Sequence, residues 1–454
     1  MFTPLRQMTD YPILSRRFVL IVILLAITTI SGCAGMRSVE VVTLPSPLHP
    51  PESVKFKEFS VAQGEAVVGR SAIIQLGKGD NLPDVARHFN LGITEISLAN
   101  PGVDMWVPEA GTQIVLPLRF ILPDVPRKGI VINLASMRLF HFRKDKEKLI
   151  VSTYPVGIGM EEKPTPMGRT YVERKVTRPT WYVPASIAAA HRKKGDILPP
   201  SVPPGPENPL GEYALYLGKS GYLIHGTNKP ASIGLKATNG CIRLYPEDIG
   251  ELYRMTPVKT PVSIIYQPYL IGQRNGVVYL EVHTPVAQQK VPEVRALFSR
   301  LRNTEKRTKR AIDWGKVDKT LAEARGIPVS ISENSTEFER RDEKPVAIRH
   351  PGKLFGHPEI PALKMNAWYV LAGERSNEKD AARLAAIINH QGPQIPARVL
   401  AKNGSHRVVA GPFENSREAR AVVKRLKIDL DLDGTLIELT GNNQSSLTFS
   451  DRNF

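Results

Sequence analysis

Two side chains near the middle of the chain could together carry out acyl transfer. Cys241 is one of two cysteines in 454 residues, and His225 precedes it in the same stretch. A thiol has an ordinary pKa of about 8.5, so it is a strong nucleophile at neutral pH only when a nearby base takes its proton. A cysteine with a histidine in reach is therefore the minimum apparatus for attack on a carbonyl and formation of a thioester.

The residues around Cys241 suit the same chemistry. Gly240 allows the backbone to approach a substrate closely, and we place Thr238 beside it among the substrate and oxyanion residues. We expect the backbone N–H groups of Asn239, Gly240 and Cys241 to point together as an oxyanion hole, in which one donor contributes about 3 kcal/mol. Two roles are open for Arg243: pairing with a substrate carboxylate, or bracing the loop.

The second cysteine, Cys33, has a different explanation. Three arginines precede the uncharged apolar run 18–30, which is shorter than the ~20 residues of a spanning helix and is typical of a signal peptide. The sequence Ile-Ser-Gly-Cys at 30–33 resembles a bacterial lipobox, which implies that Cys33 is lipidated; an uncleaved anchor is the alternative. Ala34 follows where an aspartate would signal inner-membrane retention, so the resemblance implies the periplasmic face of the outer membrane.

Composition narrows the possible partners. A chain of this length is too long for one core and predicts several domains. The formal charge of +17 favours an anionic partner, and the export signal argues against nucleic acid. The ten histidines are scattered without a metal-binding spacing, so we expect neither a metal nor a cofactor. Lipidation of Cys33 would leave Cys241 as a lone thiol in an oxidising compartment, which favours a catalytic use for it.

The region 125–270 that carries the pair reads mostly as β-strands. Alternating apolar residues predict strands at 130–134, 137–142, 149–155, 169–174, 213–217 and 222–225. Proline and two acidic residues after Tyr245 predict one short helix to Tyr253. The simplest architecture is a β-sandwich or open barrel with few helices.

The motifs in this region resemble the L,D-transpeptidase (YkuD-like) catalytic domain. They are "IHGTN" and "TNGCIRL", with "PVGIG", "TPMG", "WYVPASI" and "NPLGEYALYL" upstream. The resemblance implies that Cys241 is the nucleophile, that His225 is the general base, and that the backbone carbonyl of Gly226 orients the imidazole. Many members carry Ser-His-Gly-Cys before the nucleophile, whereas this chain has Asn239 in place of the second histidine.

Two flanking units resemble glycan-binding modules. The stretch "GDNLPDVARHFNLGITEISLANP" has a βααβ pattern over 70–118 and resembles a LysM module; an ornament of the next domain is the alternative. Residues 366–440 show a βαββαβ pattern with an internal duplication, of which "VAGPFENSREA" is the most specific part. This α+β unit resembles a SPOR domain, a family that binds peptidoglycan strands; a generic ferredoxin-like sandwich is the alternative.

The remaining segments connect these units. The predicted organisation is a signal peptide at 1–32, a tether at 33–69, an extension with a basic helix and a linker at 271–365, and a tail at 441–454. The basic stretch 288–326 is consistent with contact to an anionic surface and with a solvated helical face. We expect a flexible linker at 327–365.

Taken with the resemblance, these features imply a periplasmic enzyme of the cell wall. A peptidoglycan tetrapeptide stem would donate its diaminopimelate carbonyl to Cys241 and release D-alanine. Transfer to a diaminopimelate amine would form a 3–3 crosslink, and transfer to a lipoprotein lysine would anchor that protein to the wall. An L,D-carboxypeptidase using water and a non-catalytic wall-binding scaffold are the alternatives, and the intact Cys/His pair argues against the scaffold.

Overall fold

The computed structural model describes residues 56–285, 294–334, 336–402 and 404–439. The predicted signal peptide, the lipidation site Cys33 and the tail 441–454 lie outside the described residues. Within the described ranges, no helix combines the length and the apolar character that a membrane crossing needs.

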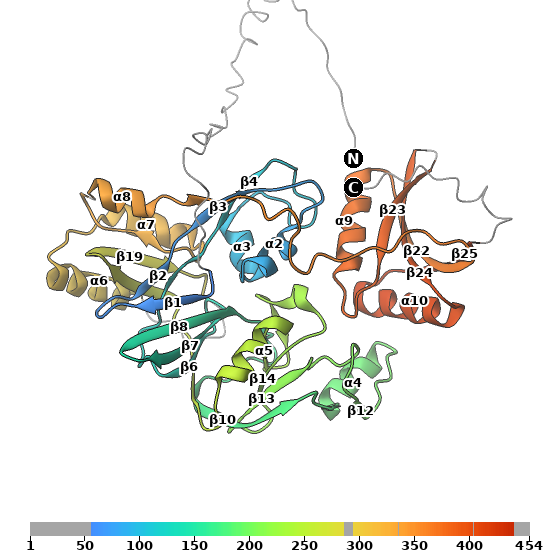
Figure 1. Cartoon of the computed structure of the whole chain (residues 1–454), viewed down its shortest axis with the longest axis horizontal. Coiled ribbons are helices and arrows are strands. Elements are labelled where there is room, and N and C mark those ends of the chain that lie inside the picture. Colours follow the sequence, from blue (N-terminus) through green and yellow to red (C-terminus); the bar gives the residue numbers. More distant parts are fainter. Residues whose placement is uncertain (1–55, 286–293, 335, 403, 440–454) are drawn as a thin grey trace, which may run out of the picture. The chain divides into compact units, whose positions relative to one another are not determined.

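A nine-stranded sheet carries the candidate catalytic residues (Figure 1). Its strands, in spatial order, are β1 (Glu58–Val61), β8 (Lys148–Pro155), β7 (Arg138–Asp145), β6 (Gly129–Asn133), β17 (Pro261–Ile265), β10 (Gly168–Thr177), β13 (Tyr213–Leu217), β14 (Leu223–His225) and β16 (Ile242–Arg243). Neighbouring strands are antiparallel except β6 with β17 and β14 with β16, which are parallel. The predicted β-rich domain is confirmed, and its sheet is a half-barrel rather than a sandwich.

One helix closes the core beside the candidate site. Helix α5 (Pro246–Met255) starts with a proline and two acids, as predicted, and buries Ile249 and Leu252 against the sheet. Helix α4 (Ala185–Lys193) was not predicted, because its one large apolar residue, Ile187, makes no stripe; none of its residues is buried. Two short ribbons complete the domain: β11 (Trp181–Tyr182) with β12 (Ser201–Val202), and β9 (Ile158–Gly159) with β15 (Lys236–Thr238).

The N-terminal βααβ module (residues 70–118) has the predicted element order. Its elements are β3 (Ala72–Gln75), α2 (Leu82–His88), α3 (Ile93–Ala99) and β4 (Gln113–Leu116). Strands β3 and β4 are antiparallel, and the Asn81 side chain caps α2 by accepting from the Asp84 N–H. The module shares one apolar core with the nine-stranded sheet, because Leu82 and Ile96 belong to the same cluster as Phe140.

The predicted tether 33–69 is wrong in its last part. Strand β1 pairs antiparallel with β8, which places Phe59 opposite Val151. Strand β2 (Val67–Gly69) pairs with β5 (Arg119–Ile121). Each strand has only three or four residues, so the alternation that marks it is easily missed.

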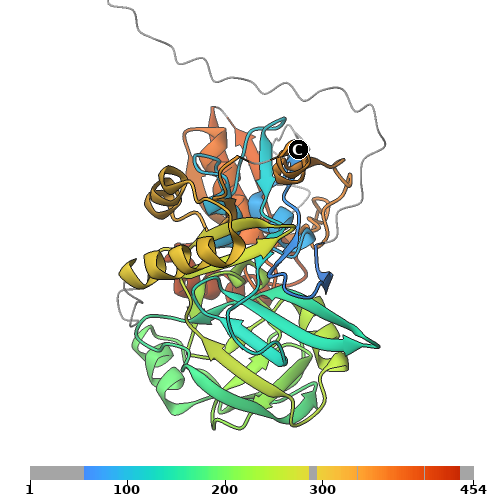
Figure 2. The ribbon, with the colours of Figure 1, turned by 90° about the vertical axis from the view of Figure 1, so that its left-hand side faces the viewer.

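The region after the catalytic domain is folded as well. Strands β18 (Tyr269–Arg274), β19 (Val277–Val282) and β20 (Val329–Ser330) form a sheet, and helices α6 (Val294–Thr308) and α7 (Trp314–Glu323) pack on it (Figure 2). The linker predicted at 327–365 is wrong where it contains β20, α8 (Glu337–Glu343) and β21 (Val346–Ala347). Strand β21 joins the sheet of the βααβ module by pairing with β3. That pairing is long-range and leaves no local periodic signal.

The C-terminal unit has the predicted βαββαβ order. Its elements are β22 (Ala367–Arg375), α9 (Glu378–Asn389), β23 (Ala397–Lys402), β24 (Ser405–Phe413), α10 (Ser416–Leu430) and β25 (Thr435–Leu439). The sheet order is β23-β24-β22-β25, and both helices contribute to one core with Val370 and Val408. At the start of α10 the Asn415 side chain accepts from the Glu418 N–H, as predicted, and the Glu418 carboxylate accepts from the Glu414 N–H.

Candidate active site

The pairing of two short strands sets the position of the Cys/His pair. Strand β14 ends at His225, and Cys241 immediately precedes β16. The two strands are parallel, with Ile224 opposite Ile242 and His225 opposite Arg243. Because side chains alternate along a strand, the two isoleucines point into the core while the other three side chains share the opposite face. Cys241 is therefore a diagonal neighbour of His225 on that face.

The imidazole of His225 is fixed and neutral. Its side chain is buried, and Nδ1 lies 2.7 Å from the carbonyl oxygen of Gly226, the contact expected from the sequence. A carbonyl can only accept, so Nδ1 carries the proton and Nε2 keeps its lone pair. Burial, and then the nearby Arg243 charge, lower the pKa of His225 to about 3, against the opposing effect of backbone hydrogen bonds at Gly226 and Leu210.

Cys241 is a protonated thiol in this environment. Its Sγ lies 3.8 Å from the carbonyl oxygen of Gly221, and the residue is partly exposed. Burial raises the pKa of the Cys241 thiol, while the Leu223 N–H and the Arg243 charge lower it. The resting pair is therefore thiol and neutral imidazole, so a thiolate must form during the reaction.

A hydroxyl closes the turn before the nucleophile. Thr238 Oγ1 donates to the carbonyl oxygen of Cys241 at 2.6 Å and accepts from the Gly240 N–H at 3.2 Å. Gly240 has a φ of +103°, and a Cβ there would lie 2.8 Å from the ring of Tyr222. The expected oxyanion hole needs correction, because the Gly240 N–H is already engaged by the hydroxyl. The Asn239 side chain is exposed.

Arg243 is half-buried beside both members of the pair. Its Nη1 donates to Ser232 Oγ at 2.8 Å, so the loop-bracing contact is present. Its Nε has no hydrogen-bond partner, and no carboxylate pairs with it among the described residues. Burial lowers the pKa of Arg243, and the nearby Cys241 opposes that shift. A guanidinium whose Nε–H is buried and unused is well placed to receive an anionic group.

Comparison with known proteins assigns the family. A family model of the L,D-transpeptidase catalytic domain matches residues 127–264, and one of the SPOR domain matches 364–438. Over 228 residues the chain is 42% identical to the probable L,D-transpeptidase YbiS of Escherichia coli (strain K12). The matched region is 49% of this chain and 74% of YbiS. The chain belongs to the L,D-transpeptidase family.

A second relative extends the match towards the whole length of a family member. This L,D-transpeptidase is 36% identical over 290 residues to the probable L,D-transpeptidase ErfK/SrfK of E. coli (strain K12), covering 61% of this chain and 91% of that one. The solved catalytic domain of the Enterococcus faecium L,D-transpeptidase matches 32% of this chain and 100% of that chain, with 21% identity and a TM-score of 0.24. The assignment rests on the sequence relatives.

Several contacts of the L,D-transpeptidase site were not predicted. Ser232 holds Arg243, the ring of Tyr222 packs on Gly240, and the Leu210 backbone reaches His225. These residues belong to loops or strand ends with no distinctive spacing. Two signals were present: Tyr222 lies in the strand predicted before His225, and Leu210 lies in the motif "NPLGEYALYL".

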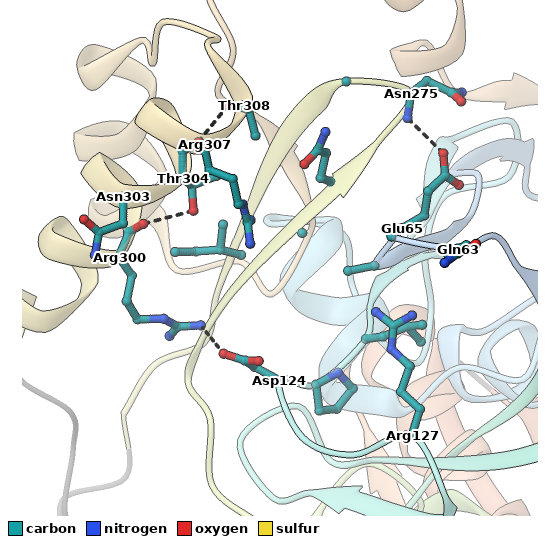
Figure 3. Close-up of a pocket in the computed structure, with 18 of the residues that line it drawn as sticks. Gln63, Glu65, Asp124, Arg127, Asn275, Arg300, Asn303, Thr304, Arg307 and Thr308 are labelled. Atoms are coloured by element: carbon teal, nitrogen blue, oxygen red, sulfur yellow. Dashed lines mark hydrogen bonds and ion pairs between the residues drawn. The ribbon is translucent and has the colours of Figure 1, made fainter.

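A separate cavity of this L,D-transpeptidase lies away from the chemistry. It measures about 970 Å³ and is lined mainly by polar side chains, among them Arg127, Arg300 and Arg307 (Figure 3). Arg300 pairs with Asp124 across it at 3.3 Å. Neither member of the Cys/His pair lines this cavity, so it is distinct from the candidate active site.

Proposed function

We propose that Cys241 attacks the diaminopimelate carbonyl of a peptidoglycan tetrapeptide stem and forms a thioester with release of D-alanine. The observation that carries this proposal is the common face of β14 and β16, on which Cys241 is the diagonal neighbour of a histidine whose Nδ1 is held by the Gly226 carbonyl. That geometry leaves Nε2 of His225 as the proton acceptor for the thiol. The family supports the L,D-transpeptidase activity.

The proton transfers of acylation balance within the pair. The Cys241 proton passes to His225 Nε2 as sulfur bonds to the carbonyl carbon. The bond from that carbon to the D-alanine nitrogen then breaks, and the imidazolium returns its proton to the departing amine. In the second half, an acceptor amine attacks the thioester, loses a proton to His225, and restores the Cys241 thiol.

The electrostatics favour a thiolate that forms only during attack. Arg243 lowers the pKa of both Cys241 and His225, so it stabilises the thiolate and makes the imidazolium short-lived. An imidazolium of low pKa returns its proton readily to a leaving amine. With the Gly240 N–H engaged, the Cys241 N–H is the donor we assign to the developing oxyanion.

The acceptor in this proposal is an amine. The side-chain amine of a second diaminopimelate gives a 3–3 crosslink, and a lipoprotein lysine gives wall anchoring. Arg243 is the residue we assign to a stem-peptide carboxylate, because its Nε is buried without a partner among the described residues. Asn239 is exposed next to the nucleophile, and we assign its side chain to donate a hydrogen bond to the substrate.

The flanking units would hold the same polymer. The SPOR domain supports peptidoglycan binding. We assign the βααβ module to a LysM-like role on glycan strands, on the basis of its sequence pattern and its element order. The export signal and the lipobox, outside the described residues, support a periplasmic enzyme anchored through Cys33 to the inner leaflet of the outer membrane.

Product analysis tests the reaction and its acceptor together. The full-length chain in detergent and a Cys241→Ala variant are incubated with tetrapeptide-bearing muropeptides, and products are resolved by mass spectrometry. The proposal predicts D-alanine release and dimers with the intact chain only. Tripeptides without dimers would indicate hydrolysis, and products from Cys241→Ala would remove the nucleophile assignment.

A further inference from the structure

One short segment between the catalytic histidine and cysteine is contacted by both flanking units. We define the bridging turn as residues 228–234, which includes the short helix η1 (Pro230–Ser232). It lies between β14, which ends at His225, and β15, which leads to Thr238. A turn placed there lies close enough in the chain to affect the site that the two residues form.

The start of helix α3 packs directly on the bridging turn. The Ile93 N–H donates to the Ile233 carbonyl at 3.1 Å, and Thr94 Oγ1 donates to the Gly234 carbonyl at 2.6 Å. Gly92 and Gly234 face each other so closely that a Cβ on Gly92 would lie 2.9 Å from Gly234 Cα. Gly92 has a φ of −85°, so its lack of a side chain is needed for this approach and not for its own backbone conformation.

The bridging turn in turn holds Arg243. Ser232 Oγ accepts from Arg243 Nη1 at 2.8 Å and donates to the Lys229 carbonyl at 2.6 Å. This hydroxyl therefore couples the turn to the Arg243 guanidinium, which lowers the pKa of both Cys241 and His225. A shift of Ser232 would move that charge relative to the nucleophile.

The SPOR domain contacts the opposite end of the same turn. Lys229 Nζ lies 3.3 Å from Asp429 Oδ2 in α10. Gly392, which follows α9, packs on the backbone carbonyl of Asn228 without room for a Cβ. The turn is thus held at residues 228–229 by one unit and at 233–234 by the other.

We propose that the βααβ module is a positioning element of the active site: Gly92 and Thr94 fix the bridging turn, and Ser232 in that turn holds Arg243 beside Cys241. Gly92, Thr94 and Ser232 act as positioning residues, because they reach the chemistry only through Arg243. This inference rests on the proposed function for its meaning, since it concerns the reactivity of the proposed nucleophile. It adds a role for the module beyond binding the wall.

The test measures thiol reactivity and needs no substrate. A full-length Cys33→Ser background leaves Cys241 as the sole cysteine, and the rate of its alkylation by iodoacetamide is followed from pH 6 to 10. Gly92→Ala should displace the turn, weaken the hold on Arg243, and slow alkylation at pH 7 about threefold as thiolate formation moves to higher pH. Thr94→Val and Ser232→Ala should act in the same direction, and Thr94→Ser should restore the wild-type profile.

Gly77→Ala is the matched control within the same module. A Cβ there meets nothing closer than 3.4 Å, so its alkylation profile should equal that of the wild type. Wild-type profiles for Gly92→Ala and Thr94→Val, with or without a loss of thermal stability, would overturn the proposal. Because no peptidoglycan is involved, a failure of the transpeptidation assay would leave this readout intact and would count against the proposed function alone.

Discussion

Thr238 and Cys241 are joined by a hydrogen bond of 2.6 Å from the threonine hydroxyl to the cysteine carbonyl oxygen. The same hydroxyl accepts from the Gly240 N–H, so one side chain defines the conformation of the turn that carries the nucleophile. These two hydrogen bonds, which we call the Thr238 clasp, fix the backbone that carries the thiol and do not involve His225. Activity should depend on that clasp more than on the size of the side chain.

Replacing Thr238 by valine tests the clasp, because valine keeps the shape and removes the hydroxyl. Losing the hydrogen bonds should raise the activation free energy by about 1.4 kcal/mol. That would reduce kcat for D-alanine release about tenfold, with little change in KM. Thr238→Ser keeps the hydroxyl and should retain most of the activity. Steady-state kinetics with a tetrapeptide donor measure both variants, and wild-type kcat in Thr238→Val would contradict the role of the hydroxyl.

Arg243 should set the pH dependence of the nucleophile. In Arg243→Gln the positive charge is lost, so the pKa of Cys241 and the pKa of His225 should both rise. The alkylation profile of Cys241 and the alkaline limb of transpeptidation should move to higher pH together. Arg243→Lys keeps a charge and should move less. A shift to lower pH in Arg243→Gln would show that the guanidinium does not favour the thiolate.

A partly buried cluster of charges joins Lys57, which precedes β1, to helix α5. Lys57 Nζ lies 2.7 Å from Asp248 Oδ1 and 2.5 Å from Glu251 Oε2, and the Asp248 side chain is buried. Burial raises the pKa of Asp248 to about 7, so its carboxylate is fully ionised only above neutral pH. There Lys57→Met leaves it without its partner and should cost about 3 kcal/mol of unfolding free energy. Urea unfolding measures the loss. The double variant Lys57→Met/Asp248→Asn should recover part of this loss. If the single and the double variant lose the same stability, Lys57 and Asp248 are not coupled.

The Asp248 carboxyl should make the free energy of unfolding depend on pH. Burial raises the pKa of Asp248 from its ordinary value near 3.8 to about 7, against the opposing charge of Lys57. The folded state then binds more protons than the unfolded state in that window, so this group's contribution to stability falls as pH rises from about 4 to 7. Asp248→Asn should flatten the slope in thermal unfolding, and an unchanged slope would assign it to another group.

Wall binding should depend on the SPOR domain. A chain ending after residue 363 lacks the matched SPOR region 364–438 and should bind purified sacculi more weakly in a pull-down. The Cys241→Ala variant keeps that domain and should bind as the wild type does. If the truncated chain binds as well as the wild type, other parts of the protein make the contact with the wall.

The sequence predicted what is local and periodic. The helix from Pro246, the βααβ order and the capped helix after Asn415 all follow from stripes, prolines and caps inside one short window. The Cys/His pair and the Gly226 contact were predicted through motif resemblance, because the motif fixes which residues face each other across β14 and β16.

Strands that pair only with distant parts of the chain were not predicted. Strands β1 and β21 join sheets whose other strands are far away in the chain, so the segments 58–61 and 346–347 read as tether and linker. The Gly240 N–H, which was expected to serve the oxyanion hole, instead donates to the hydroxyl of Thr238. Ser232 and Gly92 gained their roles only when the fold placed the βααβ module on the bridging turn.

The intact mass of the protein after brief exposure to a tetrapeptide donor tests the central claim most directly. We predict a covalent adduct on the full-length chain with the mass of the donor minus D-alanine, mapped by peptide analysis to Cys241. It should be absent in Cys241→Ala, and should form much more slowly in His225→Gln, which cannot accept the thiol proton. An adduct on any other residue, or one that persists in Cys241→Ala, would contradict the account.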